Sequence, residues 1–574
     1  MTAPEPRRRS NVTLLRFLFV LIGGAALWLG DLGVTRYLDG QKPQGYDRLD
    51  VPYFTLQLFV LGSEPLQNGG PFPWQLEVAR FLAPLFTLAA VVETARVLLA
   101  GEIRRIRARL ARGHAIVCGD TPFARALIDQ LLTGGQRVIR VRDEPFGEIE
   151  AHHDRVLTVV GDPRSAATLR GAGLGRARYV YICGDDDQVN HAVSVAASGL
   201  PAAHRRLPWI YVQINRPSTC HSLQARRLGA AGASRFRLDY FHVDDVAARV
   251  LYRRHALCPP PDGTPVRMAI AGDGTFASAL LVETARHWQA TGGPRDGLQV
   301  DLIAPDASVT ASRLAARFAF LDRDCRITPH DEPLDAWLSG LPADQGYHRI
   351  YLCPTDEAST LDRVLDSPCL WAAVSEAVFL AGYRQAALAQ AFHGERHNDL
   401  LDEINGKLVV YPIESRACDS RLITDDLTER MARQVHARYL DTARGDTTTA
   451  SHVPWERLPE SLRNANRAQV QGIAVKMQAI DCVIAVRTGH DEVIGGDEVD
   501  RLAELEHQRW CAERQGQGWR YGPTRLDRRR RHPDLVPWED LSDESKEKDR
   551  DAVRWITEIL ADEGFTIVRL TDDR

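Results

Sequence analysis

The amino-acid sequence predicts a membrane-spanning α-helical N-terminus, followed by two α/β domains with parallel sheets and by a mainly helical C-terminal domain. Three observations support this prediction. Two long apolar segments lie within residues 1–112. Two segments, 114–124 and 268–277, each run from a short apolar strand through a small-residue turn into an apolar helix. Aromatic and basic residues gather in 452–574.

Composition limits the possible functions. A chain of 574 residues is too long for one hydrophobic core and suggests roughly three or four domains. The 71 basic and 76 acidic residues give a net charge of −5, so we expect no nucleic-acid partner. The ten cysteines are scattered singly, which indicates neither a zinc site nor a disulfide framework and leaves any metal unknown.

The first two predicted elements are membrane spans. Leu14 to Val34 is apolar apart from two charged residues, and about 20 such residues cross a bilayer. A second segment runs from about Leu76 to Ala100, and its charged residues form two i,i+3 pairs that can neutralise each other: Glu77 with Arg80, and Glu93 with Arg96. A secretory signal peptide is the alternative for the first segment, but no small-residue cleavage site follows it. Basic clusters at both outer ends predict a multi-pass inner (plasma) membrane protein with both termini in the cytoplasm.

Residues 51–70 lie between the spans and predict a re-entrant or interfacial helix. The twelve uncharged residues from Val51 to Gly62 are too few to cross the bilayer. The order of span, short helix, glycine turn and span resembles the pore module of two-span potassium channels. The TVGYG filter of those channels is missing, and Gly62, Ser63 and Glu64 take its place, where a ring of Glu64 would favour cations. The alternative is an extracytoplasmic loop with a lipid-facing amphipathic helix.

The two strand–turn–helix segments predict a repeated domain, because Gly119 and Gly272 lie 153 residues apart. Each begins like a Rossmann-type nucleotide-binding unit, in which glycines let the backbone approach a pyrophosphate and the helix N-terminus favours its charge. In the first copy Thr121 and Ala124 replace the second and third glycines. Arg142 stands where an acid would hold a ribose hydroxyl. An arginine there would suit a 2′-phosphate or another anion; the alternative is that the pocket is empty.

From Gly113 to about residue 250 the order and spacing of these motifs resemble the RCK (TrkA-N) family of potassium-transport regulators. The resemblance implies ligand binding at the carboxyl ends of the strands, by Gly119, Asp120, Thr121, Arg142, Asp143, Glu144, Gly161, Asp162, Gly184, Asp185 and Asn190. The second copy, about 266–395, is more diverged, and its candidate residues are Gly272, Gly274, Thr275 and Asp306. That copy could equally be a non-binding domain that builds the assembly.

The resemblance also implies a ligand class and an assembly. We expect a nucleotide such as NAD(H), ATP or ADP, or a cyclic or ADP-ribose-type signal. RCK domains form a dimer-built gating ring, and four chains with two domains each would give an eight-domain cytoplasmic ring, as in large-conductance calcium-activated potassium channels.

A connecting segment, 396–451, precedes the C-terminal domain, 452–574. The elements Glu506-His507-x-x-Trp510, Gly518-Trp519-Arg520-Tyr521-Gly522 and His532-Pro-x-Leu resemble the RyR repeat domain in this order. Aromatic faces beside guanidinium groups can sandwich a base and clamp a phosphate. The candidate ligand residues are Glu506, His507, Trp510, Trp519, Arg520, Tyr521 and Arg525. The alternative is that the aromatics belong to the core and the arginine run is a solvated loop.

Together these features predict a ligand-gated cation channel with domain boundaries at 1–112, 113–265, 266–395, 396–451 and 452–574. The rival from another class is a membrane-anchored nucleotide sensor, or a stress or phage-defence effector, with no pore of its own. An enzyme acting on nucleotides comes third, because no nucleophile or acid/base pair stands out in the sequence.

Overall fold

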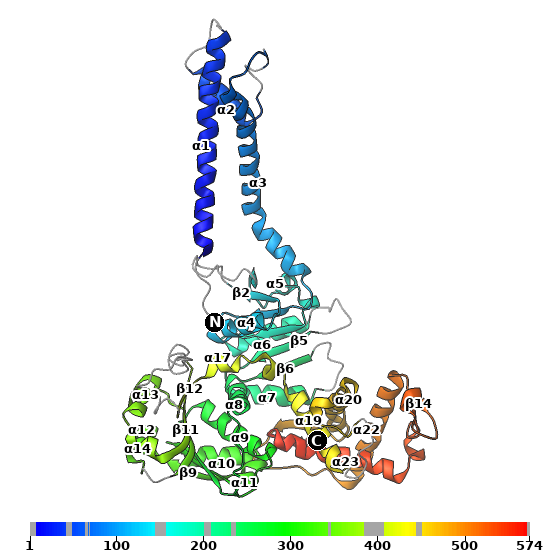
Figure 1. Cartoon of the computed structure of the whole chain (residues 1–574). Coiled ribbons are helices and arrows are strands. Elements are labelled where there is room, and N and C mark those ends of the chain that lie inside the picture. Colours follow the sequence, from blue (N-terminus) through cyan, green and yellow to red (C-terminus); the bar gives the residue numbers. More distant parts are fainter. Residues whose placement is uncertain are drawn as a thin grey trace. The chain divides into compact units, whose positions relative to one another are not determined.

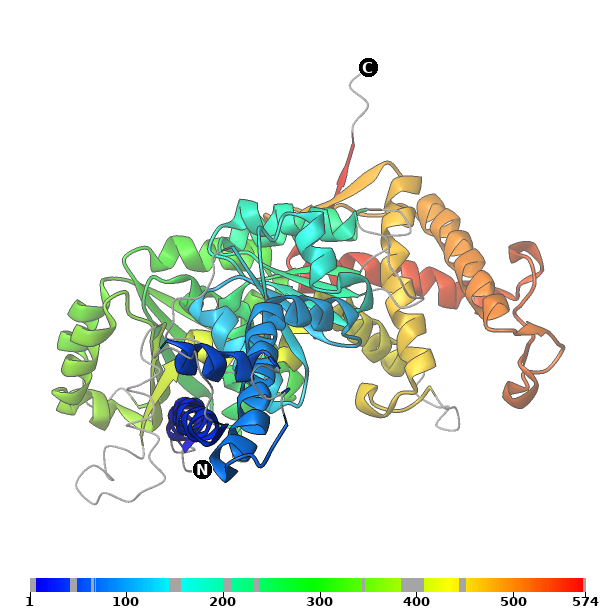
Figure 2. The ribbon, with the colours of Figure 1, turned by 90° about the horizontal axis from the view of Figure 1, so that it is seen from above.

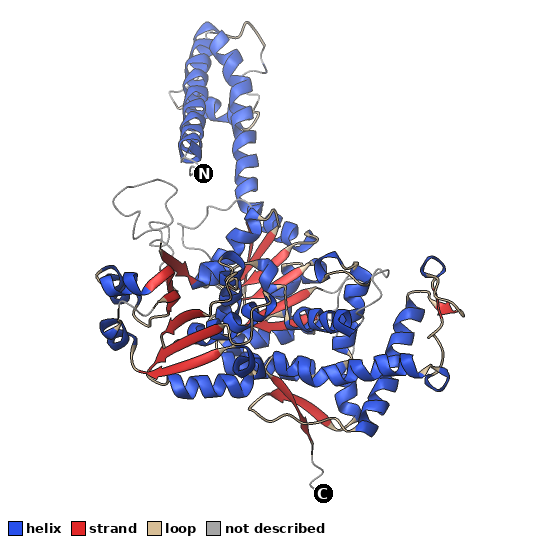
Figure 3. Ribbon diagram, turned by 60° about the horizontal axis from the view of Figure 1, so that its bottom comes forward, coloured by secondary structure: helices blue, strands red, loops and turns tan. Residues whose placement is uncertain are grey.

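The computed structural model describes residues 7–41, 49–62, 67, 69–143, 156–199, 208–230, 237–342, 346–383, 407–442 and 451–570. The chain divides into two compact units, Met1–Arg107 and Ala108–Arg574. The first unit is helical, and the second holds two parallel sheets with helices on their faces and a C-terminal helical module (Figures 1 and 3).

The N-terminal unit consists of α1 (Arg7–Gln41), α2 (Asp50–Phe59) and most of α3 (Trp74–Leu110). Phe17–Gly40 and Trp74–Ala95 are long and apolar enough to cross a membrane. Only 28% and 11% of their most apolar stretches are buried, so that side chains such as Phe81 and Leu88 face outward. A core helix of a soluble protein would bury such a surface, whereas a lipid-facing helix exposes it.

The short helix expected within 51–70 is α2, whose Phe54 and Leu58 are buried with residues of α1 and α3. The predicted pair of Arg80 and Glu77 is present, with 2.9 Å between Nη2 and the carboxylate. Gly62 follows the helix, but Ser63 and Glu64, the rest of the pore candidate, lie outside the described residues.

The first α/β domain is a six-stranded parallel sheet in the order β3-β2-β1-β4-β5-β6. Its strands are β1 (Ala115–Cys118), β2 (Val138–Arg142), β3 (Val156–Val160), β4 (Tyr179–Ile182), β5 (Trp209–Gln213) and β6 (Arg237–Phe241). Its helices are α4 (Pro122–Thr133), α5 (Ala166–Gly171), α6 (Asp187–Ser198), α7 (Pro217–Leu228) and α8 (Val243–Arg254). This order is that of a complete dinucleotide-binding fold, with the crevice at the carboxyl ends of β1 and β4, where the order reverses.

The second α/β domain repeats the same topology in the order β9-β8-β7-β10-β11-β12. Its strands are β7 (Val266–Ala271), β8 (Leu298–Ala304), β9 (Arg326–Asp331), β10 (Tyr347–Leu352), β11 (Val374–Gly382) and β12 (Leu408–Pro412). Its helices are α9 (Thr275–Ala290), α10 (Ala307–Arg317), α11 (Ala319–Asp324), α12 (Leu334–Gly340), α13 (Glu357–Leu365) and α14 (Pro368–Ala373). Because β12 pairs with β11 as the sixth strand, this domain extends to Pro412, past the boundary at 395 expected from the sequence.

The two α/β domains share one hydrophobic core. Helix α8 packs against α9 and against the short α17 (Ile413–Ala417), which also contacts α4. Buried residues of both domains, such as Leu127, Leu251 and Leu280, belong to the same cluster. The second domain therefore packs against the first at α4 and α8.

The C-terminal module follows α18 (Ser420–Ile423) and contains α19 (Leu427–Thr442), α20 (Glu460–Gln471), α21 (Ile473–Ala479), α22 (Gly496–Gly516) and α23 (Asp543–Asp562). Two short sheets complete it: β13 (Cys482–Val486) with β16 (Phe565–Arg569), and β14 (Arg520–Tyr521) with β15 (Arg531–His532). Its core includes Met431 and Val435 of α19, so the module begins inside the segment expected to be a connector. Figure 2 shows its orange and red helices on one side of the second unit and the green second α/β domain on the other.

Candidate functional site

The first glycine of each predicted turn is required by the fold. Gly119 has φ +124°, and a Cβ there would lie 2.3 Å from the carbonyl oxygen of Cys183 at the end of β4. Gly272 has φ +141°, and its Cβ would lie 2.0 Å from the carbonyl oxygen of Cys353. Only glycine permits this crossing in both copies, whether or not a ligand binds.

The hydroxyl of Thr121 has a structural role in the first turn. Thr121 is the N-cap of α4, and its Oγ accepts the N–H of Ala124 at 3.0 Å. The same hydroxyl donates to the carbonyl oxygen of Cys183 at 3.0 Å. The single proton of this hydroxyl is used in the hydrogen bond between the turn after β1 and the end of β4, so it is not available to a phosphate.

Asp120 supplies an anion to the end of β2. Its carboxylate lies 2.8 Å from Nη2 of Arg142, contacts the buried Arg140, and lies 3.7 Å from Nε of Arg125. The sequence left a 2′-phosphate, another anion or an empty pocket open at Arg142, and in the structure the carboxylate of Asp120 lies beside this guanidinium group. A phosphate at this position would compete with Asp120 for the guanidinium group.

The remaining candidates of the first domain surround the same sheet edge. Asn190 is buried, accepts the N–H of Gly184 at 2.9 Å, and donates to the carbonyl oxygens of Gly184 and Gln213. The carbonyl of Asp185 accepts the side-chain amide of Asn215 at 2.8 Å, which fixes the loops after β4 and β5 to each other.

Three further described candidates, Asp143, Gly161 and Asp162, follow the strands β2 and β3. Gly161 follows β3 and has φ +150°. The exposed Asp162 accepts the backbone N–H of Arg164 at 2.8 Å. Asp143 follows Arg142 and is exposed, whereas Glu144 lies outside the described residues.

A side chain of the first α/β domain lies at the carboxyl edge of the second sheet. Asp244 of α8 accepts hydrogen bonds from the hydroxyl of Thr275 and, at 2.9 Å, from that of Tyr383. Gly274 is the N-cap of α9, so this buried carboxylate lies at a helix N-terminus, where a phosphate would be favourable. Burial raises the pKa of Asp244 above its ordinary range. Asp306 forms the N-cap of α10. This geometry favours a structural role for the second copy.

Two C-terminal candidates are engaged within the fold. Glu506 is buried, with its carboxylate 2.6 Å from Nζ of Lys476 and 2.6 Å from Nη2 of Arg509. Burial alone would raise the pKa of Glu506, but these two cations hold it below its ordinary value. His507 places Nε2 2.9 Å from the carbonyl oxygen of Val536 and Nδ1 3.3 Å from Asp549.

An aromatic cluster lies beside these residues. The guanidinium carbon of Arg514 lies 5.8 Å from the ring centroid of Trp510 and 5.4 Å from that of Trp519. His532 meets Trp510 edge-on, with 5.0 Å between the ring centroids. Sequence reasoning missed Arg514, although its i,i+4 spacing from Trp510 on α22 was available.

The other candidates here lie at the surface. Arg520 and Tyr521 are exposed, and Nε of Arg525 lies 2.9 Å from the carboxylate of Asp527. An exposed aromatic and guanidinium surface of this kind can stack a base and contact a phosphate.

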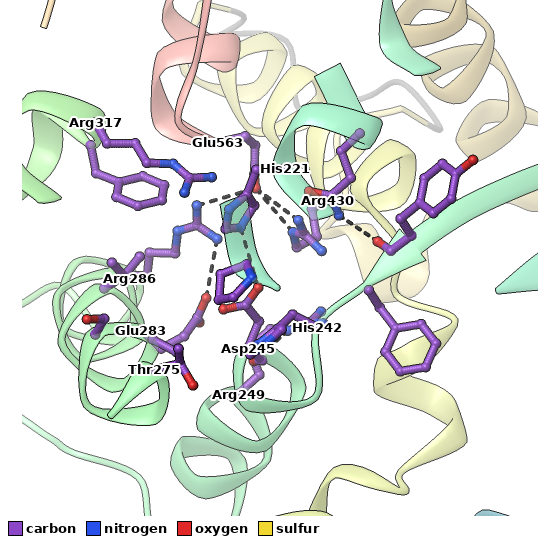
Figure 4. A pocket seen from close by; sticks show the side chains of 18 of the residues that line it. His221, His242, Asp245, Arg249, Thr275, Glu283, Arg286, Arg317, Arg430 and Glu563 are labelled. Atoms are coloured by element: carbon purple, nitrogen blue, oxygen red, sulfur yellow. Dashed lines mark hydrogen bonds and ion pairs between the residues drawn. The ribbon is translucent and has the colours of Figure 1, made fainter. Parts of the chain in front are cut away.

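A cavity of about 360 Å³ lies where both α/β domains and the C-terminal module meet. Its walls come from α7, β6 and α8 of the first domain, α9 and α10 of the second, and α19 with the turn after α23. Figure 4 shows Arg286, Arg317 and Arg430 around Glu563, which is 5% exposed. No sequence pattern indicates this cavity, because its residues are spread from position 217 to position 563.

Among the described residues, no group of three or more His, Cys, Asp or Glu side chains could hold a metal ion.

Comparisons with known proteins agree with the order of the domains. The TrkA-N domain family matches residues 115–234, and the RyR domain family matches residues 497–569. The chain carries a TrkA-N domain and an RyR domain. The TrkA-N match covers the first α/β domain through α7, and the RyR match covers α22 through β16.

Solved structures that resemble the chain include two of GsuK. The crystal structure of GsuK bound to ADP is 17% identical over 72% of this chain and 97% of that chain, with a TM-score of 0.34. The GsuK channel bound to NAD is 17% identical over 73% of this chain and 84% of that chain, with a TM-score of 0.34. A dipicolinate synthase chain from Bacillus halodurans is 11% identical over 55% of this chain and 96% of that chain, with a TM-score of 0.20.

Proposed function

We propose that the protein is a ligand-gated cation channel of the inner membrane, in which a nucleotide or nucleotide-derived signal acts on the cytoplasmic domains. The observation that carries this proposal is the end of α3. That helix contains the second apolar segment, and its last turn is part of the TrkA-N domain.

The contacts at this junction are specific. Ala108 is fully buried in the core of the TrkA-N domain. The carbonyl oxygen of Arg109 accepts a hydrogen bond from Nη1 of Arg176 at 3.0 Å, and the N–H of Gly113 donates to the carbonyl oxygen of Arg176 at 2.9 Å. Only four residues separate α3 from β1. A rotation of the TrkA-N domain would therefore pull directly on the second span.

Gating then follows from differential affinity. A ligand that binds the cytoplasmic domains more tightly in one state shifts the population toward that state. Two surfaces are the proposed ligand positions: the strand edge around Arg142 and the aromatic cluster around Arg514. The assembly we propose is a homotetramer with an eight-domain ring, in which the second α/β domain has a structural role.

The experiment is cation flux from liposomes that hold the full-length protein, with and without NAD, ADP and ATP. Arg176→Ala removes the hydrogen bond to α3, and we expect it to keep nucleotide binding while reducing the nucleotide effect on flux. Arg170→Ala, an exposed change on α5, is the matched control. Equal nucleotide responses in both variants would contradict coupling through this junction.

A membrane-anchored sensor without its own pore is the second candidate. One observation favours it: the TVGYG filter is missing from the sequence. That candidate predicts nucleotide binding with no flux under any condition.

A further inference from the structure

The wall of the cavity between the three modules includes a guanidinium group with two buried nitrogen atoms that have no hydrogen-bond partner among the described residues. Nε and Nη2 of Arg317 are buried, and neither atom has a partner among the described residues. The guanidinium lies against the ring of Phe318, 4.9 Å from its centroid. Buried N–H groups without a partner are costly, because the energy of their removal from water is not recovered.

The geometry directs Arg317 toward the centre of the junction. A Cβ on Gly564, in the turn between α23 and β16, would lie 2.8 Å from Nε of Arg317. The neighbouring Glu563 receives Arg286 at 3.3 Å and Arg430 at 3.1 Å. Figure 4 shows these three arginines converging on that turn from different elements. Arg286 and Arg430 thus pair with Glu563, whereas Nε and Nη2 of Arg317 have no hydrogen-bond partner among the described residues.

The charge of the cavity wall is positive overall. Five arginines and five carboxylic acids line it among the described residues. Burial and the neighbouring Asp239 raise the pKa of Asp426 to about 8, so that one of these two carboxyls keeps its proton at neutral pH. Burial lowers the pKa of His221, which stays neutral there. The carboxylates of the wall therefore do not fully balance its five guanidinium groups.

Other features of the wall suit an organic phosphate. Pro217 and Ser218 place the first turn of α7, which has no side-chain cap, at the cavity, and such a turn offers backbone N–H groups to an anion. Phe318 provides an apolar face between Arg317 and Arg286. A cavity of about 360 Å³ is at the lower end of the range for small-molecule sites, roughly 300–1,000 Å³.

We propose that this cavity binds a phosphate-bearing small molecule of about mononucleotide size, with the guanidinium of Arg317 as its anion contact. The site is separate from the strand edge and from the aromatic cluster of the proposed function, and it does not depend on ion conduction. Because its walls come from three modules, an occupant joins them and stabilises their arrangement.

The test is calorimetric binding to the full-length protein in detergent, with inorganic phosphate, AMP, ADP and NAD as probes. We expect AMP to bind and Arg317→Gln to weaken that binding by at least about tenfold. Arg323→Gln, whose guanidinium pairs with Asp324 at 2.8 Å outside the cavity, is the matched control and should change affinity by less than about twofold. Binding of inorganic phosphate with the same dependence on Arg317 would support an anion site. Binding of AMP but not of inorganic phosphate would show that the site also recognises the nucleoside.

Two results would overturn the proposal. One is equal affinity in Arg317→Gln and in the unmodified protein, or no binding of any probe. The other is a thermal midpoint of the probe-free Arg317→Gln protein lowered by more than about 4 °C, which would make Arg317 a structural residue. Arg142→Gln, at the strand edge, separates this site from the proposed function, because it should leave the Arg317-dependent binding intact.

Discussion

Glu563 connects the RyR domain to the second α/β domain, and its substitution by glutamine tests that connection. Its carboxylate is 3.3 Å from Arg286, 3.1 Å from Arg430 and 2.9 Å from Nε2 of Gln434. Burial alone would raise the pKa of Glu563, but the two arginines hold it below its ordinary value, so it is charged at neutral pH. Glu563→Gln removes the carboxylate that the largely buried guanidinium groups of Arg286 and Arg430 share, while Arg286 keeps Glu283 at 3.3 Å. Removal of one partner of a buried ion pair costs about 3–5 kcal/mol.

Hydrogen exchange of the full-length protein measures this cost locally. Opening of α23 and β16 should become easier, and a loss of about 3 kcal/mol lowers the protection of their amides by roughly a hundredfold. Glu558→Gln, on the same helix, changes a carboxylate that is 62% exposed and pairs with Arg438, and it should cost less than about 1 kcal/mol. Equal protection of α23 in the two variants would refute the assignment of Glu563 as the main link between these domains.

Two further predictions concern the fold of each module. Gly272→Ala forces a Cβ to within 2.0 Å of a carbonyl oxygen at φ +141° and should lower the free energy of unfolding by more than about 2 kcal/mol. In the control Gly274→Ala the new Cβ meets no atom within 4 Å, and the cost should be under about 0.5 kcal/mol. Similar denaturation midpoints of the two variants would show that the turn relaxes. Burial alone would lower the pKa of His507, but Asp549 and the carbonyl oxygen of Val536 raise it above its ordinary value. The stability that the His507–Asp549 pair contributes is therefore complete below the unfolded pKa, near 6.5, and is lost as the pH rises through the folded pKa. Asp549→Asn should flatten this dependence between about pH 6 and 8 in denaturant titrations, and an unchanged slope would exclude the pair as its source.

Much of the fold could be predicted from local sequence. Short apolar runs that end in glycine turns mark β1 and β7, and the repeat of that pattern predicted two copies of one topology. The two long apolar helices and α2 were predictable from length and hydropathy. The boundary at 395 was misplaced because β12 (Leu408–Pro412) lies far along the sequence from β11, which ends at Gly382 and with which β12 pairs.

The candidate sites were less predictable, because partners distant in sequence decide what each side chain is free to do. Glu506 has the spacing of a ligand residue, but Lys476, thirty positions earlier, neutralises it inside the core. Thr275 has the position of a phosphate donor, but Asp244 of another domain accepts its hydroxyl. The cavity around Arg317 arises only from the packing of three modules, which local patterns do not encode.

Nucleotide-dependent cation flux through the protein itself is the central claim, and liposome flux of the unmodified protein and of Glu64→Ala tests it most directly. We predict flux that changes when NAD, ADP or ATP is added, and an altered preference among cations in Glu64→Ala, because a ring of carboxylates at the pore would favour cations. Absence of flux under every nucleotide, in protein shown to be folded and oligomeric, would contradict the channel and favour the membrane-anchored sensor.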